Sequence, residues 1–258
     1  MEITGRVALV TGAGRRVGQG VAVALGRAGA KVAVHYNSSK DGAQKTVRTI
    51  LDGGVASAGK PGRAAKSGQA GDARLFKADL ADDHELAALV PAVVEQMGSL
   101  DILVNSASIF RDVRLLDTSD AEWDENFRIN VRAPFVLSRE MARALRGKPG
   151  KIVNLNDWKT ERPKRFAYGV SKAALGGLTR SLALALAPGV QVNEVALGAI
   201  LLPPGAGPGY EKVLAAKTPA GRMGTVEEVA DAVLWLIGND YVTGETVYVD
   251  GGQHLGRA

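Results

Sequence analysis

Short apolar runs alternate along the chain with longer segments in which apolar residues recur at helical spacing. The run Val7–Val10 is continuously apolar, as in a parallel strand that is buried on both faces. Comparable runs predict strands at Lys31–His35, Ala73–Lys77, Leu100–Val104, Lys151–Leu155, Gln191–Ala196 and Thr246–Asp250. The segments between them predict helices at Gln19–Ala28, Asp41–Leu51, Asp83–Met97, Ala121–Leu145, Tyr168–Leu186, Tyr210–Lys217 and Val226–Gly238.

This alternation of strands and helices predicts an α/β fold, a doubly wound, Rossmann-like parallel sheet with helices on both faces. At 258 residues, with no linker that divides the chain into comparable halves, one domain is expected over residues 1–258. Residues 53–71, rich in glycine, alanine, serine and lysine, predict a flexible surface insertion. Residues 201–217, which begin with a Pro/Gly-rich stretch, predict a loop that closes over a substrate.

The composition excludes several kinds of site. There are no cysteines, so disulfides, thiolate zinc sites and a cysteine nucleophile are absent. None of the three histidines pairs with another ligand at metal-binding spacing, and we expect no catalytic metal. The net charge of +5 comes from scattered basic residues without interleaved aromatics, so an anionic small molecule is a better partner than nucleic acid.

The chain begins Met1-Glu2-Ile3-Thr4-Gly5-Arg6 and enters an apolar strand at once. This start does not resemble a signal peptide, and no apolar run is long enough to span a membrane. A cytoplasmic location without membrane association is expected.

A glycine-rich stretch, Thr11–Gly18, lies between the first predicted strand and the first predicted helix. In this position glycines let the backbone approach a phosphate, and the helix N-terminus offers free N–H groups. The stretch therefore predicts a dinucleotide site.

The second strand runs into Asn37-Ser38-Ser39, without an acidic residue that would accept a hydrogen bond from a ribose 2′-hydroxyl. With Arg15 in the nearby turn, these polar groups suit a 2′-phosphate and favour NADPH over NADH. The alternative is that they are ordinary turn residues.

Tyr168 and Lys172 are spaced to lie on one face of a helix. A cation beside a phenol stabilises the phenolate, so we expect Lys172 to lower the pKa of Tyr168 and make it a proton donor. The alternative is a half-buried aromatic residue with a solvated neighbour.

Taken together, these residues resemble the short-chain dehydrogenase/reductase family over nearly the whole chain. The matching features are Thr11–Gly18, Asp79-Leu80, Asn105-Ser106-Ala107, Asn130, Tyr168 with Lys172, Val242-Thr243-Gly244 and Val249-Asp250-Gly251-Gly252. The resemblance implies a homotetramer and a water positioned by Asn130 for proton relay. With the residues above, it implies a cofactor site of Gly12, Arg15, Arg16, Val17, Gly18, His35, Asn37, Ser38, Ser39, Asp79, Leu80, Asn105, Ala107 and Lys172.

Two departures from the family pattern narrow the expectation. Arg16 replaces the central glycine of the turn, and Asp157 replaces the serine that usually precedes the catalytic tyrosine. Both are similar to the pteridine and dihydromonapterin reductases, which implies a pterin pocket of Arg16, Ser108, Phe110, Asp157 and Tyr168. Asp157 could instead cap its loop, and Phe110 could be a core residue. Leu197-Gly198 also replaces the usual Pro-Gly, and the loop between Asp157 and Tyr168 is shorter than usual.

We therefore expect an NADPH-dependent reductase that converts a dihydropterin to a tetrahydropterin. Hydride would pass from the nicotinamide to a C=N carbon, while Tyr168, assisted by Asp157, delivers the proton. Lys172 would hold the nicotinamide ribose, and Asn130 completes the catalytic set. The alternatives are a reductase of 3-oxoacyl groups or other ketones, and a scaffold that binds NADPH without turnover.

Overall fold

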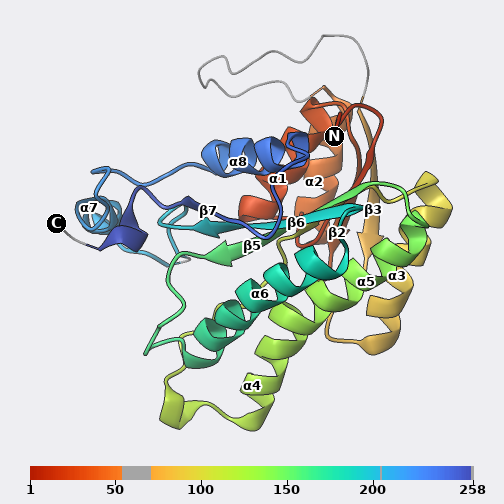
Figure 1. Cartoon of the computed structure of the whole chain (residues 1–258). Coiled ribbons are helices and arrows are strands. Elements are labelled where there is room, and N and C mark those ends of the chain that lie inside the picture. Colours follow the sequence, from red (N-terminus) through yellow and green to blue (C-terminus); the bar gives the residue numbers. More distant parts are fainter. Residues whose placement is uncertain (54–70, 204, 257–258) are drawn as a thin grey trace.

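The computed structural model describes residues 1–53, 71–203 and 205–256, which build one parallel sheet covered on both faces (Figure 1). The strands are β1 (Val7–Val10), β2 (Lys31–Tyr36), β3 (Asp72–Lys77), β4 (Ile102–Asn105), β5 (Gly150–Asp157), β6 (Val190–Leu197) and β7 (Thr246–Val249). They lie in the order β3-β2-β1-β4-β5-β6-β7, and every neighbouring pair is parallel. The predicted doubly wound sheet is confirmed.

Each face of the sheet has its own apolar cluster. One cluster lies under α1 (Arg16–Arg27), α2 (Lys40–Leu51) and α8 (Val226–Gly238). The other lies under α3 (Asp83–Met97), α5 (Ala133–Leu145) and α6 (Phe166–Ala185), on the opposite side of the sheet in Figure 1. Strands covered in this way must be apolar throughout, and all four residues of β1 and of β4 are buried. The remaining helices are α4 (Asp120–Phe127), α7 (Tyr210–Ala216) and the short turns η1 (Leu115–Asp117), η2 (Arg128–Arg132) and η3 (Gln253–Leu255).

The strand order reverses between β1 and β4, since the chain moves outward to β3 and then returns to the other side of β1. Ligands of such sheets bind at the carboxyl ends of the strands beside this reversal. The glycine-rich turn follows β1 and the Asn105 turn follows β4, so both predicted loops lie at that edge.

The helix predicted over Ala121–Leu145 is present but is not a regular α-helix throughout. It consists of α4, one wide π turn over η2, and α5. Pro134 lies in the first turn of α5 and has no N–H, so it cannot bond to the carbonyl of Asn130 as a regular helix requires. The predicted helix is therefore confirmed in extent, and the π turn inside it, which this missing donor explains, was not predicted.

Several other boundaries differ by one to three residues from the predicted ones. Strand β5 extends two residues past Leu155 because β6 supplies partners as far as Leu197, which pairs with Asp157. Helix α1 begins at Arg16 rather than Gln19, and α6 begins at Phe166. The predicted insertion at 53–71 lies outside the described residues except for its two end glycines.

In the described residues, no helix is both long enough and apolar enough to cross a membrane.

Candidate active site

The glycine-rich turn packs backbone to backbone against the loop after β4. A Cβ on Gly18 would lie 2.5 Å from the carbonyl oxygen of Gly12, and one on Gly12 would lie 3.0 Å from Cα of Ala107. Gly12 also has φ +65°, a conformation that favours glycine. The hydroxyl of Thr11 accepts from the N–H groups of Ser106 and Ala107, at 2.9 and 3.0 Å. Thr11, which was not among the predicted site residues, thus fixes the two loops to each other.

The His35 side chain is hydrogen-bonded to the glycine-rich turn. Its Nδ1 accepts from the N–H of Gly12 at 3.1 Å, so in the neutral ring Nε2 carries the proton and donates to the carbonyl of Ala78, also at 3.1 Å. Burial lowers the pKa of His35 to about 4, against the opposing effects of Ala78 and Asp79. His35 therefore positions the turn as a neutral group, and direct contact with a cofactor stays a prediction.

Except for Lys172, which lies on α6, the predicted cofactor residues lie together at the carboxyl ends of four adjacent strands. They are Gly12, Arg15, Arg16, Val17 and Gly18 after β1, His35, Asn37, Ser38 and Ser39 at the end of β2, Asp79 and Leu80 after β3, and Asn105 and Ala107 at β4. Arg15, Asn37 and Ser38 are exposed, whereas Leu80 is buried.

The geometry of this edge fits a phosphate-bearing dinucleotide. No side chain of the described residues caps the first turn of α1, which leaves its N–H groups facing the turn. The glycines allow the turn to pack closely against neighbouring protein atoms, which keeps it compact at the helix N-terminus. The side-chain oxygen of Asn105 is buried without a partner among the described residues, although a buried polar atom is normally hydrogen-bonded.

Arg16 connects the turn to the predicted substrate loop. It has φ +54°, which is uncommon for a residue with a side chain, and its guanidinium donates to the carbonyl of Leu202 at 3.1 Å. The turn and the 201–217 segment therefore meet at this arginine.

The Tyr168 hydroxyl donates to Oδ2 of Asp157 at 2.8 Å, and both side chains are largely buried. Oδ1 of the same carboxylate accepts from Arg162 at 2.5 Å and from the N–H of Lys159 at 3.0 Å. Asp157 thus caps its loop and also binds Tyr168. The result is a chain of three groups, Arg162, Asp157 and Tyr168, and Arg162 was not predicted.

The expected lowering of the Tyr168 pKa by Lys172 was wrong. Burial, followed by the neighbouring Asp157 carboxylate, raises the pKa of Tyr168 well above its ordinary value of 10, and only Arg162 and Arg165 act in the opposite direction. The phenol therefore holds its proton at neutral pH, directed at Asp157.

Lys172 lies one turn along α6 from Tyr168, as the spacing predicted. Its Nζ donates to the carbonyl of Leu155 at 2.7 Å and lies 5.9 Å from the centre of the Tyr168 ring. Burial lowers the pKa of Lys172 to about 8, while Asp157 and Glu194 raise it. A buried ammonium of this kind is poised to change charge within an accessible pH range.

Asn130 lies in the π turn and joins the β4 loop to α6. Its side-chain oxygen accepts from the Ser108 hydroxyl at 3.0 Å and from the N–H of Ile109 at 3.1 Å, while its amide donates to Ser171 at 2.9 Å. The Ser171 hydroxyl in turn donates to the carbonyl of Tyr168 at 2.7 Å. Asn130 therefore helps to fix the position of Ser108 relative to Tyr168.

Phe110 lies beside Tyr168 with the two rings edge to face, their centres 4.6 Å apart. The guanidinium of Arg165 lies over the Phe110 ring, 4.1 Å from its centre. Phe110 is 48% exposed, so simple core packing does not describe it. Arg165 is a second cation that the sequence-based site did not include.

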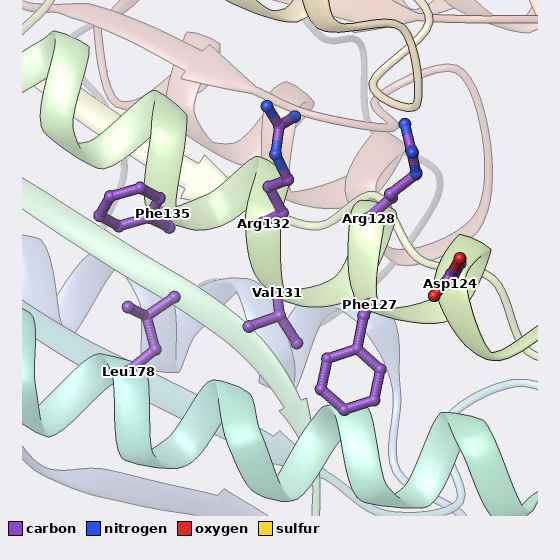
Figure 2. A pocket seen from close by; sticks show the side chains of 7 residues that line it. All are labelled: Asp124, Phe127, Arg128, Val131, Arg132, Phe135 and Leu178. Carbon is purple, nitrogen blue, oxygen red and sulfur yellow. The ribbon is translucent and has the colours of Figure 1, made fainter.

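A separate hollow of about 410 Å³ lies between η2, α5 and α6, and none of the residues lining it is a predicted site residue (Figure 2). It is lined by Asp124, Phe127, Arg128, Val131, Arg132, Phe135 and Leu178. In the part of the chain that the structure describes, no group of three or more histidine, cysteine or acidic side chains is arranged to hold a metal ion.

Comparison with known proteins agrees with this geometry. The family model described as enoyl-(acyl carrier protein) reductase matches residues 12–254. The 3-oxoacyl-(acyl-carrier-protein) reductase FabG of Staphylococcus aureus (strain N315) is 33% identical over 263 residues, covering 99% of this chain and 100% of the relative.

Two solved structures are similar over almost the whole chain. FolM alternative dihydrofolate reductase 1 from Brucella canis, complexed with NADP, has a TM-score of 0.88 and 31% identity, covering 100% of this chain and 97% of that one. The landomycin C-6 ketoreductase LanV, with bound NADP and rabelomycin, has a TM-score of 0.82 and 28% identity, covering 99% and 98%. The chain therefore belongs to the short-chain dehydrogenase/reductase family.

Proposed function

We propose that the protein is an NADPH-dependent reductase of a dihydropterin. The observation that carries this proposal is the hydrogen bond from Tyr168 to an Asp157 carboxylate that is also paired with Arg162. An ionised carboxylate cannot donate to a substrate carbonyl and repels the oxyanion that forms there. Protonation of a ring nitrogen has no such conflict, and the carboxylate can accept from the amino group of a pterin. The similar FolM structure supports the same substrate class.

NADPH is the proposed cofactor. The polar residues Asn37, Ser38 and Ser39 and the exposed Arg15 suit a 2′-phosphate, and the similar FolM and LanV structures contain NADP. When bound, NADPH supplies the hydride that is added to the ring carbon. Lys172 would donate to the ribose hydroxyls of the cofactor.

Tyr168 would give its proton to the ring nitrogen of the C=N bond as the adjacent carbon is reduced. The negative charge that develops on the phenol lies beside Asp157, which would oppose the transfer if Asp157 were unpaired. Arg162 pairs with the carboxylate and offsets its charge. Tyr168 is then reprotonated from solvent through the relay water proposed at Asn130. Phe110 and Ser108 would bind the flat heterocycle beside the nicotinamide.

The direct test is NADPH oxidation by the purified protein with dihydropterins, dihydrofolate, 3-oxoacyl thioesters and simple ketones. We expect turnover of a dihydropterin, and a fall in kcat of about 100-fold in Asp157→Ser. Asp157→Asn is the matched control for the charge, because it keeps the size of the side chain. Activity with ketones or thioesters alone would overturn the proposal.

A ketone or 3-oxoacyl reductase is the second candidate, favoured by the Staphylococcus aureus relative. In such an enzyme a hydroxyl at position 157 would donate to the substrate carbonyl, so Asp157→Ser should maintain or raise activity. A scaffold without turnover is the third candidate, and it predicts NADPH binding with no oxidation by any of these substrates.

We further propose that the hollow between η2, α5 and α6 is part of a subunit interface in a homotetramer. Phe127, Val131, Phe135 and Leu178 give it an apolar lining, and apolar surface of this kind is buried when a second copy packs against it. Analytical ultracentrifugation of the wild-type protein and of Val131→Lys tests this. A tetramer that persists unchanged in the variant would place the interface elsewhere.

A further inference from the structure

Glu194 is a buried acid that the proposed reaction does not use. It lies in β6 and is 4% exposed. Its Oε2 accepts from the Asn156 amide at 2.9 Å and from the Thr179 hydroxyl at 3.2 Å, and its Oε1 accepts from the Thr246 hydroxyl at 2.7 Å. All three donors are neutral. Donors of this kind stabilise a carboxylate inside the protein, where an opposite charge nearby is worth more than at the surface.

Asn156 connects this acid to the active site. Its amide also donates to the carbonyl of Lys172 at 3.2 Å, and its side-chain oxygen accepts from the N–H of Asp157 at 2.9 Å. The Lys172 ammonium itself donates to the neutral carbonyl of Leu155. The Asn156 side chain therefore links Glu194 by hydrogen bonds to the backbone of both Lys172 and Asp157.

Few other charges face this part of the site. Around Lys172 the charges are Asp157 on β5 and Glu194 on β6, with Arg162 beyond Asp157, and Tyr168 on α6 is a neutral titratable group. Arg180 of α6 also lies near Glu194: the Cβ position of Gly176 is 3.5 Å from Glu194 Oε1 and 3.7 Å from a guanidinium nitrogen of Arg180. Arg180 is exposed, so solvent screens its charge, whereas Lys172 is buried.

We propose that Glu194 is a positioning residue whose buried charge holds Lys172 in its charged form, while Asn156 ties Glu194 to the main chain of Lys172. This inference rests on the proposed role of Lys172 at the cofactor. The competing explanation is that Glu194 only joins β6 to α6 and β7 by hydrogen bonds. A neutral glutamine would do that almost as well, so the charge separates the two explanations.

Both acids favour the charged form of Lys172. Burial lowers its pKa to about 8, and Asp157 and Glu194 both act against that lowering. Removing the charge of Glu194 lowers the pKa further, so Lys172 loses its proton at a lower pH. A ligand that is bound through the ammonium would then be released at a lower pH as well.

The experiment measures the dissociation constant of NADPH by its fluorescence between pH 6 and pH 10, which requires no knowledge of the substrate. In Glu194→Gln and Glu194→Met the midpoint at which affinity falls with rising pH should move down by about one pH unit. Two neutral variants are tested because one of them could fail to fold. Glu194→Asp, which keeps the charge, and Thr246→Val, which removes only a hydrogen bond to Glu194, should keep the wild-type midpoint.

An unchanged midpoint in the folded neutral variants would overturn the inference, and so would an equal shift in Thr246→Val. Failure of the dihydropterin proposal appears separately, as absence of dihydropterin turnover by the wild-type protein.

Discussion

The two sides of the active site are built from different groups. The cofactor side, at the glycine-rich turn, is formed by main-chain atoms that approach closely, as at Gly12 and Gly18. The substrate side, around Tyr168, is formed by side chains that carry charge: Arg162, Asp157 and, over Phe110, Arg165. Function of the cofactor side depends on glycines that have no side chain at these close contacts. Function of the substrate side depends on the balance between positive and negative side chains.

This difference determines how each side should respond to mutation. Close backbone packing does not adjust to an added methyl group, so the cofactor side should fail sharply. A charge pair leaves partial function when one member is neutralised, so the substrate side should lose activity in steps. The variants below test this contrast.

Gly18→Ala should have the largest effect. The new methyl group would lie 2.5 Å from the Gly12 carbonyl oxygen and 2.8 Å from the Ser106 hydroxyl, so the turn must move. NADPH affinity, measured by fluorescence titration, should fall about 100-fold. Gly177→Ala is the control, since no atom lies within 4 Å of its Cβ position in α6. Unchanged affinity in Gly18→Ala would show that the turn adjusts.

The lowered pKa of His35 predicts that acid destabilises the folded protein at the cofactor side. Its pKa is about 4 in the folded protein and 6.5 ordinarily, so between these values the unfolded chain binds a proton that the folded chain does not. The free energy of unfolding therefore decreases as pH falls, by about 2 kcal/mol between pH 7 and pH 5 from this group. Urea unfolding of His35→Gln at both pH values should show a decrease in the free energy of unfolding that is smaller by this amount. His84→Gln, at an exposed histidine of α3, should behave as the wild type does, and an undiminished loss in His35→Gln would assign the effect to other groups.

The sequence was sufficient to predict those parts of the site whose residues are close together in the chain. The strand, the glycines and the helix of the cofactor side are contiguous, and the i, i+4 spacing placed Lys172 next to Tyr168. It was not sufficient where partners come from other elements. Arg162 reaches Asp157 from a loop of mostly solvated residues, and nothing in its spacing distinguishes it from Lys164.

Two features carried a signal that the hydrophobic pattern did not convey. Glu194 is an acid within a strand that is otherwise nearly all buried, and such an acid requires partners, which turned out to be Asn156, Thr179 and Thr246. Pro134 inside a predicted helix indicated the π turn. A buried acid implies hydrogen-bond partners, and a proline inside a helix implies an irregular turn. Only the tertiary structure shows which atoms are in contact.

Arg162→Gln should reduce kcat about tenfold with a dihydropterin and leave NADPH affinity within a factor of two. The loss follows because Asp157 would stay beside Tyr168 without its cation as negative charge develops on the phenol. Arg162→Lys should recover part of the rate, since it restores charge without the same geometry. Lys164→Gln, an exposed change in the same loop, should have no effect. A fall in NADPH affinity at constant kcat would move Arg162 to the cofactor side.

Arg165→Gln should have the smallest effect, because its guanidinium contacts Phe110 at a partly exposed position. We expect the KM of the dihydropterin to rise about threefold with kcat within a factor of two, in line with a cation–π contact of about 0.5–1 kcal/mol. Asp112→Asn separates the two contacts of Arg165, since it removes the 3.3 Å ion pair and leaves the guanidinium over the ring. If Asp112→Asn raises KM as much as Arg165→Gln does, the ion pair rather than the ring contact positions Phe110. If Arg165→Gln instead lowers kcat as far as Arg162→Gln, both arginines act on the charge of Tyr168, and the steps in which the substrate side loses activity are set by electrostatics alone.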